Sequence, residues 1–517
     1  MKPLLFTTLA FTLCSGLLPA ADTTKEAASK KAESTEAKKG WPEPAKVAEA
    51  MHRAITAMRK VSFAGGYAWH WPVDLSTAHG ENHSSPSLIM IQPPGTPAMG
   101  LTFLQAYRAS GDKLALQAAR EAAKSLLWCQ MATGGWGSDY DFDPRRASRL
   151  HYRRDVEAGD TEAQGRANDS TLDDQKTQTA MLFLLESAHT EEFKNDKELR
   201  AALDFGLKGL LAAQYPNGGW PQHYRGPADP RTPVVPAKVD PNWPHVWPNV
   251  DYTGFYTLND NNIHEVMKLL LRAHHLEKDE RFLAAARKTG EFLLLARLPE
   301  PQPVWAQQYN EKMEPVWARK FEPPAASSLE SFGALEALFE LWVATGEARW
   351  LEPMKPVMDW LEKVRLKDGQ WARFYELGTD KPLYCKAKTY ELTYDDSDLP
   401  THYGFKLEPK LEEGMAKMKA ALATPREELL AKREGPQTPK KWASQAKGAV
   451  AKVQTALSTQ DKKGWWLEKE EIDAGLFVKH VRAMSTYLEA AAKGGEEFTK
   501  MLKANQVKTE EAPARKP

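Results

Sequence analysis

The stretch Gln214-Tyr215-Pro216-Asn217-Gly218-Gly219-Trp220 joins the end of an apolar helical segment to a tight Gly-Trp turn. A second copy runs from Gln130 to Trp136, and weaker copies end at Trp305 and Trp371. Successive tryptophans of these turns are 84, 85 and 66 residues apart, which leaves room for two helices and a long loop in each unit. A degenerate fifth copy is a candidate between residues 460 and 465. The chain is therefore predicted to consist of repeated helical hairpins.

Apolar residues recur at helical spacing in the segments that these turns separate. Four hairpins are predicted on this basis, at residues 99–127, 181–211, 266–295 and 335–364. A further pair of helices, Trp442–Leu457 and Leu476–Ala490, is expected to close the ring against the first hairpin. A hairpin of this kind cannot bury its apolar face alone, so neighbouring hairpins stack on one another. Because strand signals are sparse, the predicted fold is all-α, an incomplete (α/α) toroid of helical hairpins with long functional loops.

The composition excludes some classes of partner. The 517 residues include 69 basic and 69 acidic side chains, so no net charge indicates nucleic acid or an anionic membrane surface as a partner. Most of the 17 tryptophans are expected in the core, although exposed tryptophans often form platforms for sugar rings. Trp220 is the tryptophan that we predict to bind substrate.

The N-terminus has the pattern of a secretory signal peptide. Lys2 precedes the apolar stretch Leu4–Leu18, and Pro19-Ala20-Ala21 forms a small-residue cleavage site. A membrane anchor is the weaker alternative, because the apolar run is shorter than the roughly 18 residues that a span requires. The predicted organisation is a signal peptide at 1–21, a disordered linker at 22–40, one α/α-toroid domain at 41–505 and a disordered tail at 506–517. We expect an exported protein, periplasmic or extracellular, that has no membrane span after signal cleavage and acts as a monomer.

Only Cys129 and Cys385 follow the signal segment. Two cysteines do not make a disulfide scaffold, and their surroundings contain neither a CxxC pair nor a zinc-binding pattern. The sequence leaves open whether the two cysteines pair.

Three predicted loop-to-helix junctions share polar residues at the start of the helix. They are Thr171-Leu172-Asp173-Asp174, Thr257-Leu258-Asn259-Asp260 and Ser327-Ser328-Leu329-Glu330-Ser331. One interpretation is helix capping, because such side chains satisfy free backbone N–H groups. The other follows from the toroid, in which equivalent positions face the same cavity. Asp173 and Asp260 then converge and offer oxygen ligands to a hard cation such as Ca²⁺.

Two basic loops each follow a tryptophan. Ala318-Arg319-Lys320-Phe321-Glu322 comes after Trp317, and Ala372-Arg373-Phe374-Tyr375-Glu376 comes after Trp371. Arginines in aromatic loops suit bidentate recognition of carboxylates, so Arg319 and Arg373 are candidate substrate-binding residues. The alternative is a surface ion pair between each arginine and the nearby Glu322 or Glu376.

Six motifs stand in a fixed order along the chain. They are Thr171-Leu172-Asp173, Tyr215 to Gln222, Asn259-Asp260, Trp317-Ala318-Arg319, Glu330-Ser331 and Trp371 to Glu376. In this order the chain resembles the family 10 polysaccharide lyases, the pectate (pectic acid) lyases with an α/α toroid, over about residues 60–406. The resemblance implies cleavage of α-1,4-polygalacturonate (pectate) by β-elimination, with a calcium ion between protein and substrate carboxylates. It also implies that Asp173 and Asp260 are the acidic calcium and substrate positions and that Arg319 and Arg373 bind the substrate.

The position of the catalytic base departs from the family pattern, which has an arginine after the Arg-Phe-Tyr loop. The corresponding segment reads Tyr384-Cys385-Lys386-Ala387-Lys388-Thr389-Tyr390, and a one-residue insertion puts Lys388 in the place of the base. Lys386 is the alternative, and a solvated loop without a base is another. A lysine suits the task because its pKa falls readily near other cations. Since a basic side chain must first lose its proton, activity is expected to be highest at alkaline pH.

Two further segments are expected to frame the groove. Asp395 to Phe405 is polar and aromatic, which makes Tyr403 or His402 a candidate for contact with a sugar, with a plain turn as the alternative. The insertion at 226–249 is rich in proline and tryptophan and is predicted to form a wall of the groove.

Three rival functions are consistent with parts of the sequence. A glycoside hydrolase on the same toroid needs a carboxylate pair, which Asp173 and Asp260 would supply, but the arginine loops favour an anionic substrate and elimination. A terpenoid-cyclase relative shares the Gln-to-Trp turn, yet Asp139-Tyr140-Asp141-Phe142-Asp143 only loosely imitates its acidic motif. A pectate-binding protein without a base is the third. The sequence also leaves open endo or exo action and the tolerance of methyl esters.

Overall fold

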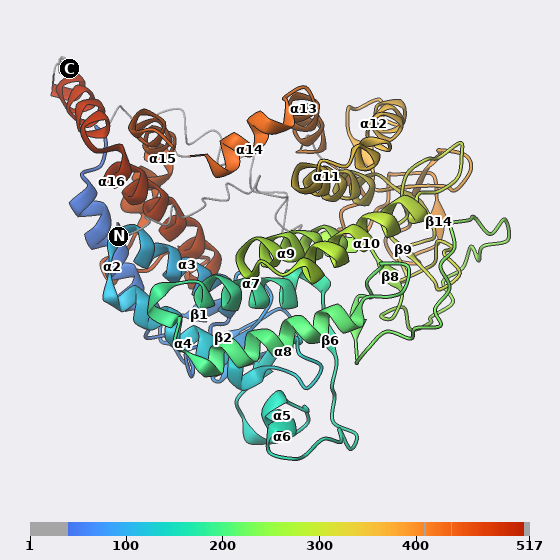
Figure 1. Ribbon diagram of the computed structural model, residues 1–517, viewed down its shortest axis with the longest axis horizontal. Coiled ribbons are helices and arrows are strands. Elements are labelled where there is room, and N and C mark those ends of the chain that lie inside the picture. Colours follow the sequence, from blue (N-terminus) through green and yellow to red (C-terminus); the bar gives the residue numbers. More distant parts are fainter. Residues whose placement is uncertain (1–39, 408–409, 436, 511–517) are drawn as a thin grey trace.

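The computed structural model describes residues 40–407, 410–435 and 437–510. Long helices form an arc, and several loops with the short strands β8, β9 and β14 lie together at the right of Figure 1. The predicted signal peptide at 1–21 lies outside the described residues, as do residues 22–39 of the predicted linker and 511–517 of the predicted tail.

Helices account for most of the regular structure. They are α2 (Pro44–Met58), α3 (Thr96–Ser110), α4 (Lys113–Cys129), α5 (Pro144–Ala147), α6 (Arg153–Glu157), α7 (Lys176–Ala188), α8 (Lys197–Ala213), α9 (Asn262–Glu277), α10 (Glu280–Ala296), α11 (Ser328–Thr345), α12 (Met354–Lys363), α13 (Lys410–Leu422), α14 (Arg426–Glu434), α15 (Pro439–Thr459) and α16 (Ala474–Glu510), with short 3-10 turns η1 (Asp173–Gln175), η2 (Glu191–Phe193), η3 (Asn259–Asn261) and η4 (Ala348–Leu351).

The strands are short and pair antiparallel in the loops. They are β1 (His70–Pro72), β2 (Ala78–His79), β3 (Ser84–Ser85), β4 (Leu88–Met90), β5 (Asp139–Asp141), β6 (Ser170–Thr171), β7 (His223–Tyr224), β8 (Tyr256–Thr257), β9 (Gln308–Tyr309), β10 (Ala326–Ser327), β11 (Trp371–Ala372), β12 (Phe374–Tyr375), β13 (Pro382–Cys385), β14 (Leu392–Thr393), β15 (Lys406–Leu407), β16 (Leu467–Glu468) and β17 (Glu471–Asp473). The sheets have the orders β16-β17-β1-β2-β3, β10-β12-β13-β14, β11-β15, β4-β5, β6-β7 and β8-β9.

The four predicted hairpins are confirmed as α3/α4, α7/α8, α9/α10 and α11/α12, whose partners pack on each other. The first helices of the hairpins also pack in a row, α3 on α7, α7 on α9 and α9 on α11. At the other end of the row, α16 packs on α3, α2 and α15, so the C-terminal pair meets the first hairpin as expected. The (α/α) toroid prediction is therefore confirmed. Helices α2, α13 and α14, which the apolar pattern had not indicated, complete the arc.

The Gln of each well-preserved turn explains why the repeat holds neighbouring hairpins together. Gln130 Nε2 donates to the carbonyl of Gly134 in its own turn (2.8 Å) and to that of Ala202 in α8 (2.9 Å). Gln214 Nε2 repeats this pattern with Gly218 (3.1 Å) and with Ala285 in α10 (3.0 Å). One side chain thus closes the turn and binds the outer helix of the next unit.

The degenerate fifth turn is confirmed by the same contacts. Gln460 Nε2 donates to the carbonyls of Gly464 (3.3 Å) and of Ala50 in α2 (3.0 Å). The tryptophan that anchors this turn is Trp466, whose indole N–H donates to the carbonyl of Ala456 (3.0 Å). The sequence had predicted Trp465 in this role. Trp136 makes the equivalent bond to the carbonyl of Leu126 (3.0 Å). The fifth unit therefore binds α2, and the N-terminal helix joins the ring next to α15.

Glu336 on α11 is a partly buried acid that faces His264 of α9. Its Oε2 lies 3.7 Å from Nδ1 of His264. Burial raises the pKa of Glu336 to about 7; the charge of Lys268 opposes the shift, and those of Glu340 and Glu265 add to it. An acid whose pKa is higher in the folded state binds its proton more tightly there than in the unfolded chain. The folded state therefore loses free energy of unfolding as the pH rises from the ordinary glutamate value towards about 7.

Glu336→Gln is expected to stabilise the protein at alkaline pH, because the amide never carries the buried charge. The gain in free energy of unfolding over the wild type should grow by about 2–3 kcal/mol between about pH 5 and about pH 8. Urea unfolding at several pH values measures it, with Glu352→Gln at an exposed position as the control. A gain that does not change with pH would rule out this linkage.

Candidate active site

Two of the three predicted junctions fold into the same unit of strand, turn and helix. In the first unit β6 leads through η1 into α7, and in the second β8 leads through η3 into α9. Strand β6 pairs with β7, which follows the turn at Trp220, and β8 pairs with β9, which follows the turn at Trp305. Each junction is thus placed by the strand of the next unit, which brings both to the same end of the toroid.

The two turns have matching left-handed backbones. In the first, Asp174 has φ 47° and Gln175 φ 62°; in the second, Asp260 has φ 51° and Asn261 φ 59°. Asp174 is therefore the structural equivalent of Asp260, whereas Asp173 corresponds to Asn259. The sequence analysis paired Asp173 with Asp260 and missed Asp174. Consecutive left-handed residues other than glycine are strained, and such strain often concentrates at functional sites.

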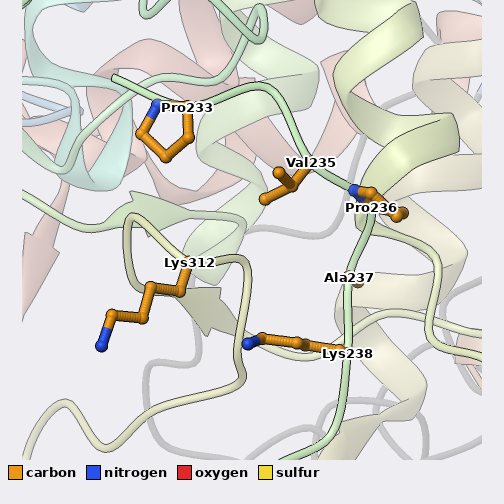
Figure 2. Close-up of a pocket in the computed structure, with 6 residues that line it drawn as sticks. All are labelled: Pro233, Val235, Pro236, Ala237, Lys238 and Lys312. Atoms are coloured by element: carbon orange, nitrogen blue, oxygen red, sulfur yellow. The ribbon is translucent and has the colours of Figure 1, made fainter. Parts of the chain in front are cut away.

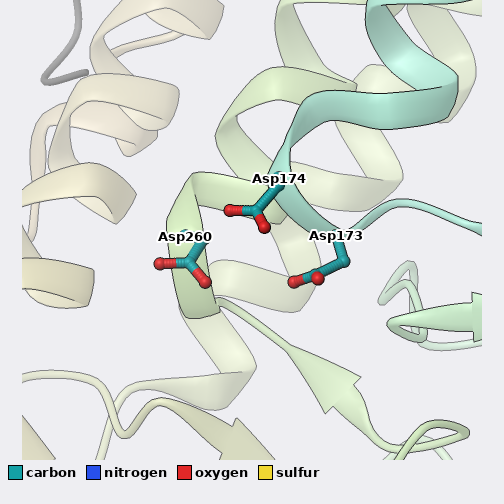
Figure 3. A group of neighbouring side chains, drawn as sticks. All are labelled: Asp173, Asp174 and Asp260. Carbon is teal, nitrogen blue, oxygen red and sulfur yellow. The ribbon is translucent and has the colours of Figure 1, made fainter. Parts of the chain in front are cut away.

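The carboxylates of Asp173, Asp174 and Asp260 converge in front of α7 and α9 (Figure 3). One oxygen from each residue lies within 4.8 Å of the others. Helix capping does not explain these carboxylates, since neither α7 nor α9 has a side-chain hydrogen bond from the residue at its N-terminal cap. A set of carboxylate oxygens at this separation fits a hard divalent cation such as Ca²⁺.

The pKa values of the three carboxyl groups are shifted in different directions. Burial raises the pKa of Asp260 to about 7, and Asp174 and Asp173 add to the shift against the opposing charge of Arg373. Burial and the charge of Asp173 also raise the pKa of Asp174. Burial acts on Asp173 as well, but the ammonium of Lys176 and a hydrogen bond from Gln222 Nε2 (3.0 Å) bring its pKa below the usual value. Burial and the neighbouring carboxylates thus disfavour the charged forms of Asp174 and Asp260.

Lys176 is a member of this cluster that sequence reasoning did not identify. Its Nζ lies 3.0 Å from Asp173 Oδ2 and 3.4 Å from Asp174 Oδ2, and its side chain is 4% exposed. The signal in the sequence was its position two residues after Asp174, at the start of the helix.

Arg373 lies next to the cluster and donates through Nη2 to the protein's own acceptors. Its Nη2 donates to Glu330 Oε1 (2.7 Å) and to Asn259 Oδ1 (2.8 Å), and lies 3.8 Å from Asp260 Oδ1. With a side chain only 5% exposed, Arg373 links Asn259, in the turn of Asp260, to Glu330 on α11. The predicted surface pair of Arg373 with Glu376 is therefore wrong. The predicted substrate contact of Arg373 stays a prediction, since its Nε has no hydrogen-bond partner in the described structure.

Arg319 is the arginine that remains accessible. Its Nε and Nη2 form a bidentate pair with Glu322 (2.8 and 2.6 Å), while the side chain is 43% exposed. Glu322 is 1% exposed, so the carboxylate of this ion pair is buried, and the pair is not a simple surface pair. Burial raises the pKa of Asp173. The charge of Lys176 opposes this effect most strongly, and the charge of Arg319 lowers the pKa further. Arg319 thus presents a fixed positive charge to the acidic cluster.

Tyr403 connects the two arginines. Its hydroxyl lies 2.9 Å from Glu322 Oε1 and 3.1 Å from Gln307 Oε1. The guanidinium of Arg373 lies 4.6 Å from the centre of its ring, and that of Arg319 lies 5.5 Å from it. Tyr403 is half-buried and orients both arginines, and the plain-turn interpretation of this segment does not account for these contacts.

The two candidate bases lie in the turn between β13 and β14. Lys386 is exposed and pairs with Glu391 (2.8 Å). Lys388 is exposed and, within the part of the chain that the structure describes, forms no hydrogen bond or ion pair. The same turn carries Tyr390, whose ring lies 3.9 Å from Nζ of Lys320 and 6.0 Å from the ring of Phe321. The turn of Lys388 therefore borders the loop of Arg319.

Trp220 is buried in the core. Its side chain is 0% exposed, and its indole N–H donates to Oγ1 of Thr289 in α10 (3.0 Å). No face of the ring is open to a sugar. Trp220 is therefore a core residue, and its predicted assignment to substrate binding is wrong. Cys129 and Cys385 are both free and buried, which answers the pairing question.

The insertion at 226–249 packs directly on the loop of Arg319. Trp317 donates its indole N–H to the carbonyl of Pro244 (2.6 Å), and Trp247 donates to that of Ala318 (2.8 Å). The insertion also borders a shallow depression of about 350 Å³ (Figure 2). Its lining residues are Pro233, Val235, Pro236, Ala237, Lys238 and Lys312. None of these lining residues is acidic, so the depression is a different site from the carboxylate cluster.

One protein family matches the central part of the chain. Residues 130–370 match the family described as pectic acid lyase, which confirms the resemblance predicted from the sequence. The match includes Asp173, Asp174, Asp260 and Arg319 and ends before Arg373, Lys388 and Tyr403. No curated protein matches the chain. Within the described ranges, no helix combines the length and the apolar character that crossing a membrane would need.

Solved structures show more distant similarities. One is a mutant of family 10 polysaccharide lyase from Cellvibrio cellulosa in complex with trigalaturonic acid, with 19% identity and a TM-score of 0.44, covering 63% of this chain and 99% of that one. Another is cellobiose 2-epimerase from Bacillus thermoamylovorans, with 13% identity and a TM-score of 0.43, covering 86% and 100%. A third is a family 76 glycoside hydrolase from Bacteroides thetaiotaomicron, with 10% identity and a TM-score of 0.43, covering 86% and 99%.

Proposed function

Because residues 130–370 match the pectic acid lyases, we propose that this protein is an exported pectate lyase that cleaves α-1,4-polygalacturonate by β-elimination. The observation that carries the proposal is the convergence of three carboxylates, Asp173, Asp174 and Asp260, beside the accessible guanidinium of Arg319. It acts as a monomer in the periplasm or outside the cell, with polygalacturonate as its partner.

The substrate explains why these residue types stand together. Elimination removes the proton from the carbon next to a uronate carboxylate, and this proton is barely acidic while the carboxylate carries its full charge. A calcium ion held by Asp173, Asp174 and Asp260 would neutralise part of that charge and so acidify the C–H bond. Fixed positive charge near the carboxylate lowers the barrier for the same reason, and such electrostatic stabilisation is usually the largest contribution to catalysis.

Arg319 is the residue that binds the substrate carboxylate in this proposal. Glu322 holds its Nε and Nη2, and Tyr403 fixes Glu322 from the other side. The guanidinium therefore keeps one orientation before substrate arrives and loses little conformational entropy on binding. Arg373 positions the turn of Asp260 through Asn259. The segment 226–249 contacts the Arg319 loop and would form one wall of the substrate groove.

Lys388 is the proposed base. Lys388→Ala is expected to lower kcat on polygalacturonate by about 10²- to 10⁴-fold, the usual contribution of a general base. Stability should not change, because the side chain is exposed and free of hydrogen bonds in the described structure. Lys386→Ala is the matched control from the same turn and should keep wild-type kcat. Initial rates of unsaturated product formation, measured by ultraviolet absorbance over a range of alkaline pH, give the result.

Two outcomes would contradict the assignment of the base. Wild-type kcat in Lys388→Ala would remove Lys388 from the mechanism, and loss of kcat in Lys386→Ala alone would transfer the role to Lys386. Lys388→Arg should keep part of the activity and shift the pH profile upward, because an arginine loses its proton at higher pH than a lysine.

The rival functions give different products in the same assay. The wild-type protein is incubated with polygalacturonate, once with calcium and once with a chelator. A lyase forms unsaturated ends that absorb in the ultraviolet, whereas a hydrolase forms reducing ends without that absorbance. A protein that only binds pectate forms neither, and a flat trace beside measurable binding would refute the proposed lyase.

A further inference from the structure

Lys176 places a buried positive charge inside the carboxylate cluster. It is the first residue of α7, and its Nζ contacts one oxygen of Asp173 (3.0 Å) and one of Asp174 (3.4 Å). The side chain is 4% exposed, so its ammonium group is buried among the residues that would hold the calcium ion.

The second unit of the toroid shows that the fold does not require a cation at this position. The equivalent residue is Asn262, the first residue of α9. Its Nδ2 donates to the carbonyl of Pro221 (3.3 Å), and its Oδ1 accepts from Gln178 (3.2 Å). Asn262 is buried like Lys176 and follows the same left-handed turn, but it is neutral. The charge of Lys176 thus serves the cluster and not the local backbone.

An ammonium at this place has two effects on a metal ion. It occupies Oδ2 of both Asp173 and Asp174, and so reduces the number of free oxygens that a calcium ion, which takes six to eight oxygen ligands, can use. It also repels a divalent cation, and this repulsion is screened only weakly because the side chain is almost completely buried. In return, it compensates the repulsion between the carboxylates when no metal is bound.

We propose that Lys176 is a resident counter-ion of the cluster, which keeps Asp173 and Asp174 in place without metal and makes calcium binding weak and readily reversible. The inference rests on the calcium site of the proposed function. It predicts that the protein responds to calcium at the concentrations found outside cells and that a chelator does not destabilise it.

Calcium titration by calorimetry in the absence of pectate tests the proposal. The wild type is expected to bind with a Kd of about 10⁻⁴ to 10⁻³ M, the range of extracellular sites. Lys176→Met keeps most of the side-chain volume without the charge and should bind at least about tenfold more tightly. Lys176→Arg keeps the charge and should stay near the wild type. A wild-type Kd below about 10⁻⁵ M, or a Lys176→Met Kd equal to or weaker than that of the wild type, would overturn the proposal.

Thermal unfolding gives a second readout that does not depend on catalysis. With a chelator, Lys176→Met should melt at a lower temperature than the wild type, because its carboxylates repel one another, and calcium should restore the Tm. The Tm of the wild type should hardly change between chelator and millimolar calcium. A wild-type Tm that collapses with chelator would contradict a resident counter-ion. If Lys176→Met does not fold, Lys176→Asn, which copies Asn262, takes its place. If neither variant folds, the calcium Kd of the wild type tests the proposal.

These measurements separate the failure of this inference from the failure of the proposed function. Tighter calcium binding in Lys176→Met without cleavage of polygalacturonate by the wild type would support the counter-ion and refute the lyase. Cleavage by the wild type together with unchanged calcium affinity in Lys176→Met would support the lyase and refute the counter-ion.

Discussion

Asp174→Asn is expected to lower kcat/KM on polygalacturonate by about 10²- to 10³-fold, the size of loss seen when one preorganised electrostatic group is removed from an active site. The substitution keeps the shape of the side chain and removes one of three converging carboxylates. Because burial and the charge of Asp173 raise the pKa of Asp174, the folded protein holds this charge at a cost in stability. The Tm of Asp174→Asn should therefore equal or exceed that of the wild type, while activity falls.

Asp196→Asn is the control for this change. Asp196 is also an aspartate at a helix start, since its side chain accepts the backbone N–H of Leu199 at the first turn of α8. Asparagine caps a helix about as well as aspartate, so neither activity nor Tm should change appreciably. Steady-state kinetics and thermal unfolding of both variants give the comparison. Wild-type kcat/KM in Asp174→Asn would exclude Asp174 from the site and leave only Asp173 and Asp260.

Gly218→Ala is expected to destabilise the protein by at least about 3 kcal/mol, enough to prevent accumulation of folded protein in a marginally stable chain. Gly218 has a left-handed backbone with φ 90°, and a Cβ there would lie 1.9 Å from the carbonyl oxygen of Lys288 in α10. A backbone atom cannot move away without shifting α10. The same turn carries Gln214, whose bond to Ala285 would be lost with it.

Gly159→Ala separates the backbone conformation from the close contact. Gly159 has φ 94°, nearly the same as Gly218, but a Cβ there would meet no atom within 4 Å. The expected loss is only the roughly 1–2 kcal/mol that a left-handed conformation costs an alanine. Urea unfolding of the two variants compares them, and equal losses would show that the packing of the turn on α10 contributes nothing.

The sequence was informative about the fold because the turns are local. A Gln followed by a Gly-Trp turn contains its own hydrogen-bonding partners, as Gln130 and Gly134 show, and helical periodicity needs no knowledge of distant residues. The fifth turn was identified with the wrong tryptophan, Trp465 in place of Trp466. The two are adjacent, and the choice depends on which indole reaches the carbonyl of Ala456.

The candidate site was predicted in part. Asp173, Asp260 and Arg319 were found because their loops repeat, and the structure brings Asp173 and Asp260 together. Asp174 was missed because the equivalence with Asp260 is set by two left-handed residues, Asp174 and Gln175, which a sequence does not reveal. Trp220 was assigned to the substrate because a tryptophan in a turn looks the same whether its ring faces solvent or Thr289.

The sequence by itself therefore determined the hairpins, their turns and the acidic and basic residue types that suit a uronate polymer. Only the tertiary structure decided which carboxylates meet. It also decided that Arg373 donates hydrogen bonds to Glu330 and Asn259 and that Arg319 remains accessible. The physical reason is the range of the interactions. Turn closure and helical periodicity act over a few residues, whereas the charge state and exposure of a side chain depend on groups brought near it from other parts of the chain, as Asn259 and Arg373 are.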